Sequence, residues 1–249
     1  MDGLSSRTIS YTMTILDSIL EQAVKDDIIP KNYMKNIDRP KQVKIRHMVT
    51  LSVDEVKSFL SNISNVEHHA LFKLAFATGM RRSELLGLRW SDIDFKKSTI
   101  SISQTALKIG STAVISHTTK TTSSKRIIAI DTETLQELLK HKIVIDRRRI
   151  KTMNWINNNL VFPGIKGGPR CPDEVSKLCK KYANLIGKPS FTMHGTRHTH
   201  ATLLIENGAN MKAIQERLGH ASFQETMDTY SHVTPKMEDD IVERISKIF

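Results

Sequence analysis

Several features that would place the protein in a well-defined class are scarce or missing in this sequence. Its 249 residues include 2 cysteines, Cys171 and Cys179, which form neither a CxxC pair nor a disulfide framework. No run approaches the roughly 18 consecutive apolar residues of a membrane-spanning helix. The first residues lack the basic segment and apolar stretch of a secretory signal, so we expect an intracellular protein.

A metal centre is also poorly supported. The run HGTRHTH, residues 194–200, places His194 and His198 four apart, on one face of a helix. A catalytic zinc motif of the HExxH type would add a glutamate between them, but here Gly, Thr and Arg intervene, and Arg197 would repel a cation. No acidic cluster is present either, which disfavours a metal-dependent nuclease. We therefore expect no metal and no other cofactor.

The charge balance is strongly basic. Lys and Arg number 37 against 26 Asp and Glu, a net charge of +11 with a pI near 9.6. This excess favours a polyanionic partner, with nucleic acid as the leading candidate, over a protein that is merely basic. Hydrophobic residues make up 39% of the chain, which is enough for a packed core.

The hydrophobic pattern predicts a mainly α protein with a small antiparallel β-sheet, an α+β arrangement. Residues 6–28 carry an apolar stripe at helical spacing, and Ser52 followed by Glu55 is a capping-box pattern that begins a second helix. A buried helix should end at Gly79, and a short one should follow it. Residues 98–130 alternate or are β-branched and predict the sheet. Further helices are expected over 132–150, 172–186, 196–207, 210–219, 222–230 and 236–248.

Cationic side chains gather at four places near expected turns or helix ends. These are TGMRRSELLGLRW with Arg81 and Arg82, HTTKTTSSKR with Lys120, HGTRHTH with His194 and Arg197, and ERLGHASFQETMDTYSHV with His220. Two guanidinium groups with a lysine and imidazoles could bind and polarise a phosphate without a metal.

The tyrosine of the last motif, Tyr230, is the candidate nucleophile. Its phenol, with an ordinary pKa of about 10, needs about 4 kcal/mol to ionise at neutral pH, a cost that neighbouring cations and an imidazole base can reduce. The alternative is a half-buried aromatic residue at a helix end.

These motifs together resemble a known family. ATGMRRSELLGLRW, HGTRHTHATLLIENGANMKAIQERLGH and DTYSHV, in this order across residues 50–233, are similar to the signatures of the tyrosine recombinases, above all the integrases of phages and integrative conjugative elements. The resemblance implies the catalytic-domain fold of that family. It also implies a site-specific recombinase that integrates and excises DNA through a covalent 3′-phosphotyrosine intermediate.

The resemblance implies a role for each matching residue. Arg81 matches the first catalytic arginine, and Glu84 the carboxylate that orients it. Lys120, favoured over Lys125 in the same loop, matches the lysine that protonates the leaving 5′ oxygen. The remaining matches are His194 as a base or phosphate donor, Arg197 as the second arginine, His220 as a further phosphate contact and Tyr230 as the nucleophile.

Other residues have expected supporting roles. His198 and His200 match no catalytic position and should support the fold or touch DNA. Residues 38–47 form a basic linker that could lie along DNA. The candidate DNA-binding residues are Arg39, Lys41, Lys44, Arg46, Arg82 and Lys125.

The resemblance also implies two domains. Residues 1–47 should be the last part of a helical core-binding domain plus the linker, so we expect a fragment of a longer protein. Residues 48–249 should form the catalytic domain, with a tail helix over 236–249. The tail carries an apolar stripe that could cap its own core or dock on a neighbouring protomer, as in a tetramer on double-stranded DNA. The expected location is the bacterial cytoplasm, at the nucleoid.

Two other functions fit part of the pattern. A type IB topoisomerase would use the same chemistry, but the LGH and YSHV segments favour an integrase. A noncatalytic DNA-binding regulator would use the helices around residues 196–219, but it would have no need for two arginines, a lysine, two histidines and a tyrosine.

Overall fold

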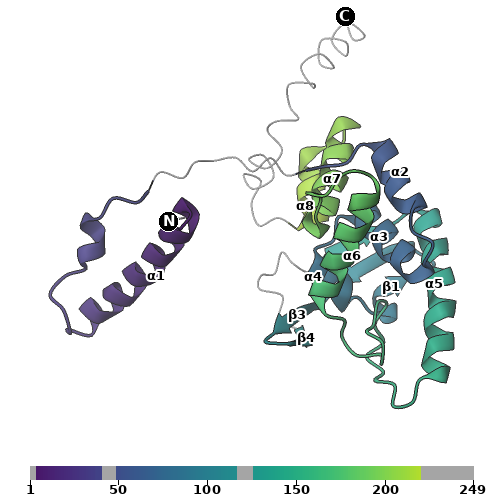
Figure 1. Cartoon of the computed structure of the whole chain (residues 1–249), viewed down its shortest axis with the longest axis horizontal. Coiled ribbons are helices and arrows are strands. Elements are labelled where there is room, and N and C mark those ends of the chain that lie inside the picture. The colour runs from purple at the N-terminus through teal and green to yellow at the C-terminus, as the bar shows by residue number, and fades with distance from the viewer. Residues whose placement is uncertain (1–3, 41–48, 117–125, 220–249) are drawn as a thin grey trace, which may run out of the picture. The chain divides into compact units, whose positions relative to one another are not determined.

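The computed structural model describes residues 4–40, 49–116 and 126–219 (Figure 1). By its contacts the chain divides into two compact units, Met1–His47 and Met48–Phe249. Among the described helices, none is long and apolar enough to cross a lipid bilayer. The helices predicted over 222–230 and 236–248 lie outside the described residues.

The first unit contains helix α1 (Ser6–Lys25) and the short 3₁₀ helix η1 (Tyr33–Asn36). The chain returns along α1 because the Asn32 amide donates hydrogen bonds to Asp17 Oδ1, at 2.8 Å, and to Glu21 Oε2, at 3.1 Å. The helix ends three residues earlier than the predicted residue 28.

The second unit is built around α3 (Val66–Thr78), which is buried on almost every side. Leu71, Phe72 and Leu74 have no exposed surface, and α3 contacts both α5 and α7. An aromatic cluster joins α3 to its neighbours, since the ring of Phe59 packs edge-on against that of Phe72 at 5.1 Å between centroids. A helix enclosed in this way holds its end in a fixed place, which matters for the residues that follow it.

The remaining helices of this unit surround α3. The predicted capping box is confirmed, because Ser52 accepts from the backbone of Glu55 while the Glu55 side chain accepts from that of Ser52. The helices and the 3₁₀ turn are α2 (Val53–Ser61), α4 (Arg82–Gly87), η2 (Trp90–Asp92), α5 (Thr132–Lys151), α6 (Pro172–Leu185), α7 (Met193–Glu206) and α8 (Met211–Leu218).

The five described strands of the second unit form two separate antiparallel sheets. Strands β1 (Ile93–Asp94), β2 (Thr99–Ile102) and β5 (Arg126–Ala129) form an antiparallel sheet in the order β1-β2-β5, whereas β3 (Thr105–Ile109) and β4 (Thr112–Ser116) form a separate hairpin. The chain leaves the first sheet after β2 because the buried Gln104 amide donates to Gly87 O of α4, at 2.7 Å. The antiparallel pairing is as predicted, and the separate hairpin is a detail that the sequence did not indicate.

Helix α3 ends at Gly79, as predicted. Gly79 has φ +63°, a left-handed conformation that costs other residues energy. A side chain at this position would also lie 2.7 Å from His200 Cδ2 and 2.8 Å from Leu218 Cδ2. The tight turn lets α7 and α8 pack directly against the end of α3.

We predict that Gly79→Ala destabilises the protein more than Gly110→Ala. Gly110 has nearly the same φ, +59°, but a side chain there would meet nothing within 4 Å. Gly110→Ala should cost about 1 kcal/mol for the backbone alone, and Gly79→Ala roughly 2–4 kcal/mol because the clash adds to it. Urea unfolding of both variants measures the difference. Equal losses would show that contact with α7 and α8 at Gly79 is unimportant.

Candidate active site

Side chains of α7 and α8 satisfy the carbonyl groups at the end of α3. His200 Nδ1 lies 2.7 Å from Phe76 O, and an Arg217 terminal nitrogen donates to Ala77 O at 2.9 Å. Arg217 Nε donates to His200 Nε2 at 3.0 Å, so the histidine carries its proton on Nδ1 and donates it to Phe76 O. The last carbonyls of a helix lack intrahelical partners, and here they serve to fix two other helices.

The histidines of HGTRHTH point to different surroundings. Helix α7 begins at Met193, three residues before the predicted start, because Thr192 caps it by accepting from Gly195 N. His194 and His198 pack edge-to-face, 4.6 Å apart, while His200 turns to the end of α3. Within the described ranges, no three His, Cys, Asp or Glu residues are placed to share a metal ion. His200 thus supports the fold, one of the two roles expected for it.

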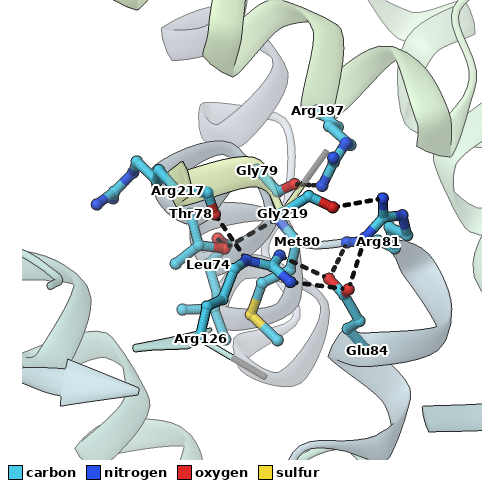
Figure 2. A network of polar contacts seen from close by, with 10 residues as sticks. All are labelled: Leu74, Thr78, Gly79, Met80, Arg81, Glu84, Arg126, Arg197, Arg217 and Gly219. Atoms are coloured by element: carbon cyan, nitrogen blue, oxygen red, sulfur yellow. Dashed lines mark hydrogen bonds and ion pairs between the residues drawn. The ribbon is translucent and has the colours of Figure 1, made fainter. Parts of the chain in front are cut away.

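Arg197 and Arg81 converge on one pocket. Arg197, only 2% exposed, donates to Gly79 O at 2.9 Å, and Arg81 follows Gly79 by two residues. Figure 2 shows the two guanidinium groups near each other at the turn after α3. A pocket of about 610 Å³ is lined by both of them and by His194 at the start of α7. Segments more than 100 residues apart in sequence thereby place two fixed positive charges and an imidazole around one space.

Glu84 holds Arg81 in this position. Arg81 Nη1 donates to Glu84 Oε1 at 3.0 Å, and Arg81 Nη2 donates to Gly219 O at 3.0 Å. The same carboxylate accepts two hydrogen bonds from Arg126, at 3.0 and 2.9 Å (Figure 2). Burial raises the pKa of Glu84, but the bonds and charges of the two arginines outweigh burial and lower it below the ordinary value. Glu84 is therefore ionised at neutral pH.

His194 is neutral at neutral pH. Desolvation lowers the pKa of His194, and the positive charges of Arg197 and Arg81 lower it further. A neutral imidazole can accept a proton or donate a hydrogen bond, depending on its tautomer. A bound phosphate would partly cancel the charges that depress this pKa and make His194 a better base.

Two of the predicted DNA-contacting arginines, Arg82 and Arg39, have protein partners. Arg82 lines the pocket, and its guanidinium donates to Ser176 Oγ and, at 3.4 Å, to Pro172 O. Arg39 forms an ion pair with Asp17 at 3.6 Å in the first unit. The other predicted site residues, Lys41, Lys44, Arg46, Lys120, Lys125, His220 and Tyr230, lie outside the described residues.

Three basic residues of this region were missed by sequence reasoning. Arg126 binds Glu84, Arg217 caps α3, and Lys108 of β3 lines the pocket while paired with Asp173 at 2.6 Å. A weak signal existed for Arg126, which is the first residue of the β-branched segment RIIAI. Lys108 had no signal, because an exposed lysine in a hairpin is ordinary.

Cys179, a buried thiol of the second unit, is not a candidate nucleophile. Cys179 has no exposed surface, and burial raises the pKa of its thiol to about 12. A thiol with such a pKa is protonated and inert at neutral pH.

Comparison with known proteins identifies the family. The profile of the phage integrase family matches residues 50–237, most of the chain. The chain belongs to the phage integrase family. It is 30% identical over 264 residues to the "Tyrosine recombinase XerC-like" protein of Caldanaerobacter subterraneus subsp. tengcongensis, covering 99% of this chain and 68% of the relative. The ICEBs1 integrase of Bacillus subtilis is 28% identical, covering 99% and 67%.

Solved structures agree with this membership. The Tn1549 transposon integrase, in complex with transposon right end DNA, matches with a TM-score of 0.79 and 27% identity, over 98% of this chain and 81% of that chain. XerA recombinase, at 23% identity and a TM-score of 0.61, shares the fold. The predicted resemblance and fold class are thus confirmed, and this family member is a tyrosine site-specific recombinase. The topoisomerase and regulator alternatives are not favoured.

We predict that His200 makes the recombinase sensitive to acid. Burial, followed by the Arg217 charge, lowers the pKa of His200 from 6.5 to about 4. In the unfolded chain His200 is protonated below about pH 6.5, whereas in the folded protein it is protonated only below about pH 4. The free energy of unfolding therefore falls as the pH drops from 6.5 to 4. The loss due to His200 is at most roughly 3 kcal/mol.

Urea unfolding at pH 7 and pH 4.5 measures this effect in the native protein and in His200→Asn. The asparagine amide can still donate to Phe76 O but does not titrate, so its stability should fall less between the two pH values. Parallel losses in both proteins would contradict the assignment and attribute the acid sensitivity to other groups.

Proposed function

We propose that this recombinase cleaves and rejoins double-stranded DNA at an attachment site, with Arg81, His194 and Arg197 binding the scissile phosphate. Support comes from the pocket that these three side chains share. Each guanidinium presents a planar fork that pairs with two phosphate oxygens. Two of the N–H groups of Arg81 are engaged by Glu84 and Gly219 O, and we propose that others bind the phosphate.

We assign the chemical steps to His194 together with Tyr230, Lys120 and His220, the last three of which lie outside the described part of the chain. The Tyr230 oxygen attacks the scissile phosphorus and forms a 3′-phosphotyrosine bond, while the bond to the 5′ oxygen breaks. His194 accepts the phenol proton, and Lys120 gives a proton to the leaving 5′ oxygen, with His220 as a further phosphate contact. Attack by a 5′-hydroxyl reverses these transfers, so rejoining needs no nucleotide cofactor. The arginines stabilise the charge that grows on the phosphate oxygens.

The assembly is proposed from relatives. The Tn1549 integrase has been solved in complex with DNA, and we propose that this chain likewise binds DNA. Assembly into a tetramer on that DNA is proposed from the resemblance of its motifs to those of the tyrosine recombinases. The C-terminal stretch 236–249 would either cap its own catalytic domain or dock on a neighbouring protomer. The site of action would be the nucleoid of a bacterial cytoplasm. The net charge of +11 favours binding to the negatively charged backbone of DNA.

We predict that a nicked suicide duplex carrying the attachment site forms a denaturant-resistant adduct with the protein, and that Tyr230→Phe abolishes the adduct. Loss of the hydroxyl removes the nucleophile while leaving the ring. Denaturing electrophoresis in EDTA detects the adduct. An adduct that persists in Tyr230→Phe would contradict the assignment, and cleavage that disappears in EDTA would indicate a metal-dependent nuclease instead.

We predict different kinetic defects for two adjacent arginines. Arg81→Ala should slow adduct formation roughly 10²–10³-fold at saturating DNA, because it removes a fixed donor to the reacting phosphate. Arg82→Ala should mainly weaken DNA binding, since its guanidinium is bound to Ser176 and Pro172 of α6 rather than to Glu84. Single-turnover rates against DNA concentration separate the two effects. Equal rate losses at saturation would show that Arg81 has no special place at the phosphate.

A further inference from the structure

One carboxylate ties together three segments around the pocket. Glu84 of α4 is 3% exposed and accepts hydrogen bonds from Arg81 and, through both oxygens, from Arg126 at the first residue of β5. The Arg126 side chain is 7% exposed, so this ion pair lies almost out of water. A fork that binds both oxygens of a carboxylate fixes its orientation as well as its charge.

Both arginines also reach the end of α8. Arg126 Nε donates to Arg217 O at 2.7 Å, and Arg81 Nη2 donates to Gly219 O at 3.0 Å (Figure 2). The bonds form a closed circuit: Glu84 binds both arginines, and each arginine binds a carbonyl at the C-terminal end of the same helix. Rotation of Glu84 or movement of α8 would therefore change the position of Arg81.

The backbone at Gly219 is shaped around Arg126. Gly219 has φ +68°, and a side chain there would lie 2.9 Å from Arg126 Nη1 and 3.2 Å from its Cζ. The Arg126 side chain thus lies so close to Gly219 that this position has no room for a side chain. This close fit and the three hydrogen bonds restrict the movement of the Arg126 side chain.

Two residues of the circuit lie next in sequence to segments that contain expected catalytic residues. Arg126 directly follows the segment 117–125, which contains Lys120, and Gly219 directly precedes His220. The chain leaves the described structure next to the circuit on both sides. Arg126 therefore anchors β5 and α8 to the carboxylate that orients Arg81.

We propose that Arg126 is a positioning residue for strand cleavage: by clamping Glu84 and the end of α8 together, it sets the place of Arg81 in the pocket. This inference rests on the proposed function. Simple stabilisation explains the arrangement less well, because a buried ion pair is often no more stable than apolar residues of the same volume. A displacement of reacting groups by about 1 Å can cost roughly 10²-fold in rate, so an effect on cleavage should exceed the effect on folding.

The variants Arg126→Ala and Arg126→Lys test this proposal. The lysine keeps the positive charge near Glu84 but cannot donate along the three directions that the guanidinium serves. Arg148→Ala is the matched control. Arg148 Nη1 binds the buried Glu67 at 2.8 Å and its Nη2 lies 3.4 Å from Pro163 O, the same kind of contacts away from the pocket.

For each protein we would measure urea unfolding, DNA affinity and the single-turnover rate of adduct formation at saturating suicide duplex, at a temperature where all are folded. We expect Arg126→Lys to retain most of the stability and DNA affinity yet to form the adduct at least tenfold more slowly, with a larger rate loss in Arg126→Ala. Arg148→Ala should lose stability but keep a rate within about threefold of the native one.

Two results would overturn the proposal. One is a saturating rate in both Arg126 variants within about threefold of the native rate. The other is a rate loss in Arg148→Ala as large as that in Arg126→Ala, which would mean that stability alone sets the rate. The proposed function fails separately, since it requires the native protein to form an adduct that depends on Tyr230, whatever the Arg126 variants do.

Discussion

Carbonyl oxygens at the end of α3 bind side chains from α7 and α8, and the pocket depends on these bonds. The buried helix presents its last carbonyls at a glycine turn, where His200, Arg217 and Arg197 donate to them. The same turn carries Arg81 to the pocket two residues later. Packing of the core thus determines where two guanidinium groups meet, and no local segment could do so by itself.

The positive charges of the arginines repel one another, and hydrogen bonds to fixed acceptors in the protein offset this repulsion. Arg81 and Arg126 share the Glu84 carboxylate, and Arg197 rests on a backbone carbonyl. These partners hold the donors in place before any phosphate arrives, so little reorganisation is required during the reaction. Glu84 remains ionised because the two arginines outweigh its burial, and His194 remains neutral because desolvation and the arginines lower its pKa.

Much of the fold and part of the site could be predicted from the sequence. Among the described residues, periodicity and capping patterns located the helices to within a few residues, and the order of motifs brought Arg81, His194 and Arg197 into one hypothesis. The role of Arg126 could not be predicted, because Glu84 lies 42 residues away and a basic residue before a strand is unremarkable. The separation of the two sheets escaped prediction for a similar reason, since it depends on Gln104 reaching a carbonyl of α4.

The central claim is that the arginines of the pocket act on the charge of the scissile phosphate. Replacing one non-bridging oxygen of that phosphate by a methyl group removes the charge, so cleavage rates of the native protein and of Arg81→Ala should be compared on both DNAs. The account predicts a loss of roughly 10²-fold or more on ordinary DNA that shrinks to a few-fold on the methylphosphonate. An equal loss on both substrates would contradict it and place Arg81 away from the reacting group.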